Sequence, residues 1–155
     1  MYKETVQAVG TVVIELRDSD GQLKTRHEDT NLIVTAGRAY LASRLLANTA
    51  AVISHIGIGD STSAAAAGQT DLQAATNKVR VATSSATNVT TNVTNDSAQY
   101  VATFAAGTAS WALTEAGLFN AASAGTMLSR IVFPVINKGA ADSLTVTWKI
   151  VMLGN

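Results

Sequence analysis

Strict alternation of apolar and polar positions marks both ends of the chain as β-strands. The alternating sets are Val12, Ile14 and Leu16 early in the chain, and Leu144, Val146, Trp148 and Ile150 near its end. Because successive side chains of a strand point to opposite faces, the members of each set share one face. We expect the strand face that carries each set to be buried, and we expect Trp148 to belong to the core.

A turn sequence follows the first alternating set. The segment "DSDG", Asp18 to Gly21, separates the run "VVIELR" from a polar run, "QLKTRHED". Asp and Ser favour turns and glycine takes positive φ without strain, so these residues predict a β-hairpin within residues 1–30. We expect its polar return strand to be solvated. The hairpin is a candidate docking arm, because an exposed strand can extend the sheet of a neighbour.

One helix is predicted near residues 36–47, in the segment "TAGRAYLASRLLAN". Thr35 is the expected N-cap and Asn48 the expected stop. Apolar residues recur here at the spacing of one helix face. The expected buried stripe is Ala39, Ala42 and Leu46, widened by Leu41 and Leu45.

The remainder of the chain is rich in strand-forming residues. Runs dense in valine and threonine, such as "KVRVATSSATNVTT", favour strands, and Pro134 in "RIVFPVIN" indicates an edge or a bulge. No repeat or linker divides the chain, so we expect one domain over residues 1–155. The expected fold is mainly all-β: an antiparallel sandwich or barrel of about seven or eight strands, with the helix and sandwich in residues 31–155.

Composition removes several classes of function. Charged residues make up 14% of the chain and hydrophobic residues 47%, with 11 basic and 11 acidic side chains. A neutral chain has no electrostatic footprint for nucleic acid or anionic membrane, so neither partner is expected. The lack of cysteine excludes disulfides and thiolate metal sites, and no apolar run approaches the length of a membrane span.

The two histidines, His27 and His55, form no recognisable catalytic pattern. Their separation gives neither a helical metal pair nor a triad spacing. We expect His55 to be a packed or hydrogen-bonded strand residue and His27 to be exposed. The segment "GIGD" lacks the lysine and hydroxyl residue of a phosphate-binding loop. The sequence therefore predicts no catalytic residues, no cofactor and no metal.

Glu115 is the carboxylate most in need of an explanation. It lies among apolar residues in "TEAGLFN", and a buried carboxylate is either desolvated and reactive or paired. We expect it to be paired, with Arg80, with Arg130 or with backbone amides. The neighbours expected to permit close approach, or to fill the core or an interface, are Gly117, Leu118 and Phe119.

An ordered series of short motifs runs through the chain: "ISHIGIGD", "QTDLQAATNKVRVA", "YVATF" and "TEAGLFN" followed by "GTMLSRIVF". This series resembles the attachment domains of tail-fibre and tail-collar proteins of contractile-tailed bacteriophages. Upstream, "NLIVTAGRAYLASRLLA" is similar to small structural proteins of tailed phages. The resemblance spans about residues 31–153, and its matching positions are Gly57, Gly59, Asp60, Thr70, Leu72, Arg80, Glu115, Gly117, Leu118 and Phe119.

The resemblance implies a non-enzymatic structural protein of the virion, made in the cytoplasm of the host bacterium. Its implied partners are copies of itself, in a symmetric oligomer such as a trimer, and neighbouring phage tail or capsid proteins. Because the sequence ends at Asn155, directly after the last predicted strand, we expect a free-standing accessory or fibre-attachment subunit of the tail or baseplate. A capsid decoration protein is the alternative.

Two further classes of function stay open. A carbohydrate-binding module would present aromatic rings to a sugar, and Trp111 is its candidate because Trp148 belongs to an apolar alternating set. A small hydrolase would use Glu115 as its acid.

Overall fold

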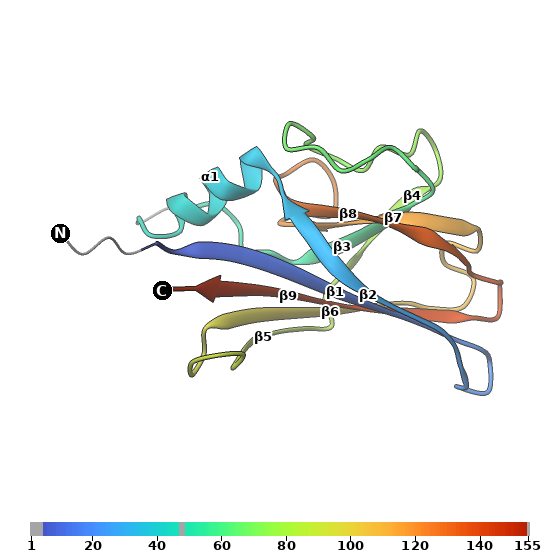
Figure 1. The fold of residues 1–155 in the computed structure, drawn as a ribbon. Helices are drawn as coiled ribbons and strands as arrows, with labels where there is room; N and C mark the ends of the chain where they lie inside the picture. Colours follow the sequence, from blue (N-terminus) through green and yellow to red (C-terminus); the bar gives the residue numbers. More distant parts are fainter. Residues whose placement is uncertain (1–4, 47–48, 155) are drawn as a thin grey trace.

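Antiparallel β-strands make up most of the computed structural model, which describes residues 5–46 and 49–154. Within these residues there are nine strands and one helix (Figure 1). In chain order they are β1 (Gln7–Arg17), β2 (Leu23–Ile33), α1 (Thr35–Ser43), β3 (His55–Gly59), β4 (Lys78–Ala82), β5 (Ser85–Val89), β6 (Ser97–Phe104), β7 (Ala112–Phe119), β8 (Met127–Asn137) and β9 (Ser143–Leu153).

These strands form one curled sheet, in the order β4-β3-β7-β8-β2-β1-β9-β6-β5. The sheet changes layer at β2, which pairs with β1 up to Asn31 and then with β8 at Leu32 and Ile33. Figure 1 shows β2 crossing diagonally from the layer of β1 and β9 to the layer of β7 and β8. The result is two facing layers, as in a β-sandwich.

The two outermost strands, β4 and β5, are consecutive in the chain and are joined by Thr83 and Ser84. The amide of Thr83 donates to the carbonyl of Ser54, 2.8 Å away, and the amide of Ser84 donates to the carbonyl of Val101, 2.7 Å away. This connection holds the two ends of the sheet near each other, which gives the sandwich a barrel-like closure.

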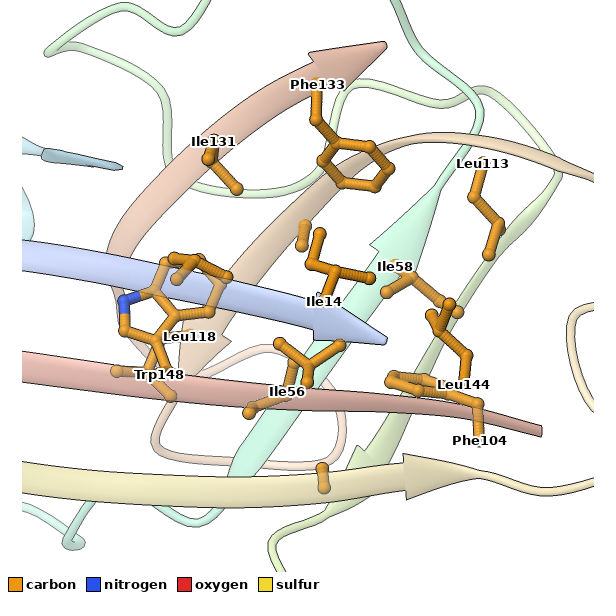
Figure 2. Packing of buried hydrophobic residues seen from close by; sticks show 14 of the residues in the cluster. Ile14, Ile56, Ile58, Phe104, Leu113, Leu118, Ile131, Phe133, Leu144 and Trp148 are labelled. Carbon is orange, nitrogen blue, oxygen red and sulfur yellow. The ribbon is translucent and has the colours of Figure 1, made fainter. Parts of the chain in front are cut away.

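The main core lies between the two layers. The alternating set of β1 is buried there, and Trp148 of β9 is fully buried, as expected. The facing layer contributes Ile56, Ile58, Leu118, Ile131 and Phe133. Figure 2 shows Ile14 and Trp148 of one layer and Ile56, Ile58 and Phe133 of the other pointing into the space between the layers. Removal of this apolar surface from water is the main stabilising contribution to such a sandwich.

The structure confirms the expected all-β fold with a single helix. It has nine strands in the described residues, where the sequence predicts about seven or eight. The difference arises in the valine- and threonine-rich run, which folds into two short strands with Thr83 and Ser84 between them. The predicted turn is also present, since the amide of Gly21 donates to the carbonyl of Asp18 and Gly21 has a φ of 80°.

The predicted hairpin is built into the sheet and does not extend from it as a separate arm. β1 lies between β2 and β9, and it pairs with β9 along its whole length, from Gln7 to Arg17. Residues 1–4 of the predicted arm lie outside the described residues. Of the two hairpin strands, only β2 keeps an edge that is free over most of its length.

Helix α1 exists but buries a different face from the predicted one. Ala39, Ala42 and Leu46 are exposed, and the buried residues are Gly37 and Tyr40. Gly37 sets this face because its backbone lies directly against the backbone of Leu128, where a Cβ would collide. The N-cap is Val34, without a side-chain hydrogen bond, so the prediction for Thr35 is wrong. Residue 47 of the predicted helix and the predicted stop at Asn48 lie outside the described residues.

Candidate functional site

Residues 60–77, which we call the strap, connect β3 to β4 and contain no helix or strand. Long connections without regular structure are uncommon in compact domains, and many have a specific role. The strap lies on the outer face of β3 and β7, away from the main core (Figure 1). Its Leu72 packs with Val34, Phe119 and Met127 in a second, smaller apolar cluster.

Glu115 fixes the strap to the sheet through both of its carboxylate oxygens. Oε2 accepts a hydrogen bond from the amide of Gln73 at 2.9 Å, and Oε1 accepts one from the amide of Ala74 at 2.8 Å. Oε2 also accepts a bond from Nε of Arg130 at 2.9 Å. Glu115 is fully buried, so its charge is balanced entirely by these protein donors.

Arg130 extends this arrangement from the sheet to a second point of the strap. Its guanidinium is fully buried, and Nη2 lies 2.8 Å from Oε2 of Glu115 as an ion-pair contact without hydrogen-bond alignment. Nη1 donates to the side-chain carbonyl of Gln69 at 3.0 Å. We define the clamp as Glu115, Arg130 and the strap groups that these two side chains bind.

Glycines on β3 and β7 provide the space for the clamp. Gly59 pairs with Glu115 across the two strands, and a Cβ on Gly59 would lie 2.5 Å from Oε1 of Glu115. Gly57 pairs with Gly117, and a Cβ on Gly117 would lie 2.8 Å from Cε2 of Phe119. The close approach predicted at Gly117 is therefore that of an aromatic ring, which lies over the bare backbone.

Arg80 belongs to the same outer face but does not bind Glu115. Its guanidinium lies 3.5 Å from the ring centroid of Phe119, and Nη2 donates to Oδ1 of Asp71 at 2.8 Å. Nη1 donates to the carbonyls of Ala121 and Ala124 at 3.0 and 2.8 Å. Arg80 therefore links the strap to the loop between β7 and β8.

Asp71 is held by two cations. Besides its bond with Arg80, its Oδ2 accepts a hydrogen bond from Nζ of Lys78 at 2.9 Å. Burial raises the pKa of Asp71, but the hydrogen bonds from Lys78 and Arg80 outweigh this effect and hold the pKa below its usual range. The strap carboxylate is thus charged at neutral pH.

The structure brings together most of the residues singled out in the sequence. The pairing expected for Glu115 is present with Arg130 and with backbone amides, whereas Arg80 pairs with Asp71. Leu118 points into the main core and Phe119 into the second cluster. Trp148 is a core residue of the opposite layer and does not belong to the clamp. Both carboxylate oxygens of Glu115 accept hydrogen bonds, and the side chain is buried.

Gln69, Gln73 and Ala74 are clamp residues that sequence reasoning does not find. Gln73 and Ala74 contribute backbone amides, and a backbone donor leaves no signature in the choice of side chain. The one sequence signal is Gly59, which stands where any side chain would displace the carboxylate.

The histidines and tryptophans lie in structural positions. Nδ1 of His55 lies 2.9 Å from Oγ of Ser54, as expected for a hydrogen-bonded strand histidine. His27 is half-buried beside Phe133, at 6.0 Å between ring centroids, so the expectation of an exposed His27 is wrong. Trp111 is half-buried and packs against the main core.

An apolar groove lies at the other end of the molecule, between α1 and the neighbouring ends of β1, β2 and β9. It has a volume of about 970 Å³, and its apolar lining includes Val6, Leu32, Leu45 and Met152. Leu45 and the adjacent Leu46 are 89% and 73% exposed, respectively. This end therefore presents apolar surface that the described part of the chain does not cover.

Neither a metal cluster nor a membrane-spanning helix is found in the residues that the structure describes. In residues 5–46 and 49–154, no three His, Asp or Glu side chains gather as metal ligands would. No helix of this part of the chain is long and apolar enough to cross a membrane.

Comparisons with known proteins give no match. No protein-family model matches the chain, and no curated protein or solved structure is detectably similar to it.

Proposed function

We propose that this protein is a non-enzymatic structural subunit of a bacteriophage virion, located at the tail or baseplate. One observation supports the proposal above others: positions of the phage-like motifs meet in a single structural device. The outer face of β3 and β7 brings together Gly57, Gly59, Leu72, Glu115 and Gly117. Motif positions that are far apart in the sequence thus lie together at and around the clamp.

The chemistry of that device favours a structural role. Its only buried carboxylate, Glu115, is neutralised by Arg130 and by the amides of Gln73 and Ala74. A general acid or nucleophile needs a free oxygen within reach of a substrate, and this one has none. The clamp instead fixes an irregular segment on a sheet, which is useful where a loop must keep its shape against a neighbouring subunit.

The surface supports association with other subunits. Exposed large apolar side chains gather around α1 and the adjacent strand ends, including Val6, Leu45, Leu46 and Met152. Contiguous apolar surface of this kind commonly marks an interaction site. Together with the low charge of the chain, this favours a protein that works inside a symmetric assembly of copies and neighbouring tail proteins.

Immunogold labelling of purified virions with an antibody against this chain tests the proposal. Label at the tail or baseplate is the expected result. Label on the capsid shell would replace the tail assignment with a decoration protein, and virions without label would contradict a virion role altogether.

A separate pair of variants addresses the two other classes of function. Glu115→Gln is expected to leave any hydrolytic activity of the purified protein unchanged. Trp111→Ala is expected to leave any glycan binding by the purified protein unchanged. A hydrolytic activity lost in the first variant, or glycan binding lost in the second, would contradict the structural assignment.

A further inference from the structure

Strand β2 has a long free edge in the described part of the chain. From Leu23 to Thr30, β2 pairs with β1 on one side and with no strand on the other. Every residue in this stretch is exposed except His27, which is half-buried. An open edge of this length is a template onto which another strand can pair.

The other free edges are obstructed. β8 is free beyond its pairing with β2 at Ser129 and Arg130, but Pro134 lies there and the register shifts opposite it. A proline and a bulge both prevent regular pairing. The outermost strands β4 and β5 are short, and the chain connects them directly. β2 has no such obstruction, because its register with β1 is regular from Thr25 to Asn31.

The charges along this edge change sign at its centre. Lys24 and Arg26 come before His27, and Glu28 and Asp29 come after it. A row of like charges would repel an identical strand. A strand with this pattern attracts a second copy that runs antiparallel to it, because the positive half of each strand then faces the negative half of the other.

We propose that two copies of this protein associate through β2, antiparallel and centred on His27. A two-fold axis normal to the sheet requires one residue to face itself. If His27 is that residue, Arg26 of each copy faces Glu28 of the other. Centring on Arg26 or on Glu28 instead would place like charges opposite each other, so the charges select one register.

The intrachain ion pair fits this arrangement. Arg26 and Glu28 lie 2.7 Å apart within one chain, and both side chains are exposed. In the pair of copies, the two arginines and two glutamates alternate at the corners of a square, so each charge has one opposite charge beside it on its own strand and another facing it on the partner strand. The existing bond does not have to break, and the continuous sheet gains the backbone hydrogen bonds of the new pairing.

This inference rests on the proposed function for its purpose, because it names the surface through which copies of an assembly subunit would meet. It replaces the trimer implied by the family resemblance with a two-fold dimer as the basic unit. Sedimentation velocity of the purified full chain over a range of concentrations tests it, with inorganic salt as a second variable. The wild-type protein is expected to dimerise, more weakly as salt rises.

Charge variants of the edge give the decisive result. Arg26→Glu and Glu28→Arg each place two like-charge contacts in the dimer, and each is expected to weaken dimerisation by about tenfold or more. A mixture of the two variants restores both attractive contacts, so a heterodimer is expected. Asp20→Arg carries the same charge change as Glu28→Arg on the same hairpin, off the edge, and is expected to dimerise as the wild type does.

A monomeric wild-type protein, single variants that dimerise like the wild type, or a mixture without heterodimers would each overturn the proposal. Because the measurement uses purified protein alone, such a result contradicts the β2 interface only. The location in the virion is tested separately by immunogold labelling of particles. If virions carry no label but the purified protein dimerises through β2 as described, the proposed function is contradicted and the dimer interface is supported.

Discussion

The main core and the clamp stabilise opposite faces of the same strands by different physics. On the inner face of β3 and β7, Ile56, Ile58 and Leu118 bury apolar surface against the other layer, and this attraction has no direction. On the outer face, Glu115 and Arg130 bind a segment that has no regular structure, through directed hydrogen bonds. A core of many similar contacts tolerates small changes, whereas a buried ion pair depends on every partner.

The largest effect is expected from removing one side of the buried pair. Glu115→Ala leaves the guanidinium of Arg130 without its counter-charge and the amides of Gln73 and Ala74 without acceptors, and should cost about 3–5 kcal/mol of unfolding free energy. Urea denaturation measures it. The double variant Glu115→Gln with Arg130→Met should lose less unfolding free energy than the sum of the losses in Glu115→Gln alone and Arg130→Met alone. Additive effects would contradict a coupled pair.

Filling the glycine space is expected to have the next largest effect. Gly117→Ala places a methyl group against the ring of Phe119 and should destabilise the protein by about 1–3 kcal/mol through overpacking. Gly68 offers a matched control within the strap, because a Cβ there meets nothing within 4 Å and its φ is not positive. Gly68→Ala should change stability by no more than about 0.5 kcal/mol. Equal effects at the two glycines would show that the close approach has no energetic weight.

A conservative change in the main core should be milder. Ile14→Val removes one methylene group from a fully buried side chain and should cost about 0.5–1.5 kcal/mol. The cost should appear as a lower denaturant midpoint with an unchanged slope. A loss as large as that of Glu115→Ala would mean that the core is no more tolerant than the clamp.

The smallest effect is expected at Asp71 of the strap, which is half-buried and binds Lys78 and Arg80. The folded state lowers the pKa of Asp71, so its contribution to stability is present above the unfolded pKa and is lost as the pH falls through the folded value. Asp71→Asn should therefore cost less than about 1 kcal/mol at neutral pH, because the pair is partly solvated. The difference from wild type should shrink below about pH 4. A constant difference down to pH 2 would contradict this role.

The same comparison explains how much could be predicted from the sequence. The alternation of Val12, Ile14 and Leu16 depends only on neighbours in the chain, so the inner faces and the all-β class could be predicted. The face of α1 could not, because the contact of Gly37 with the backbone of Leu128 is tertiary and overrides the pattern of alanine and leucine.

Prediction of the clamp shows the same limit. That Glu115 is paired follows from its apolar surroundings, but the choice of Arg130 over Arg80 follows from the register of β7 and β8, in which Gly117 faces Arg130. The two strap amides could not be predicted, since any non-proline residue supplies an amide. The polar edge of β2 was visible in the sequence, but its freedom depends on β2 leaving β8 after a two-residue pairing.

Amide hydrogen exchange at Gln73 and Ala74 tests the central claim most directly. Both amides lie in a segment without helix or strand, and each donates to a carboxylate oxygen of Glu115. They are expected to be protected in the wild-type protein, and to lose that protection in Glu115→Ala while Val146 and Trp148 of the main core keep theirs. Gln73 and Ala74 amides that exchange in the wild-type protein as fast as those of an open loop would contradict a strap held by Glu115.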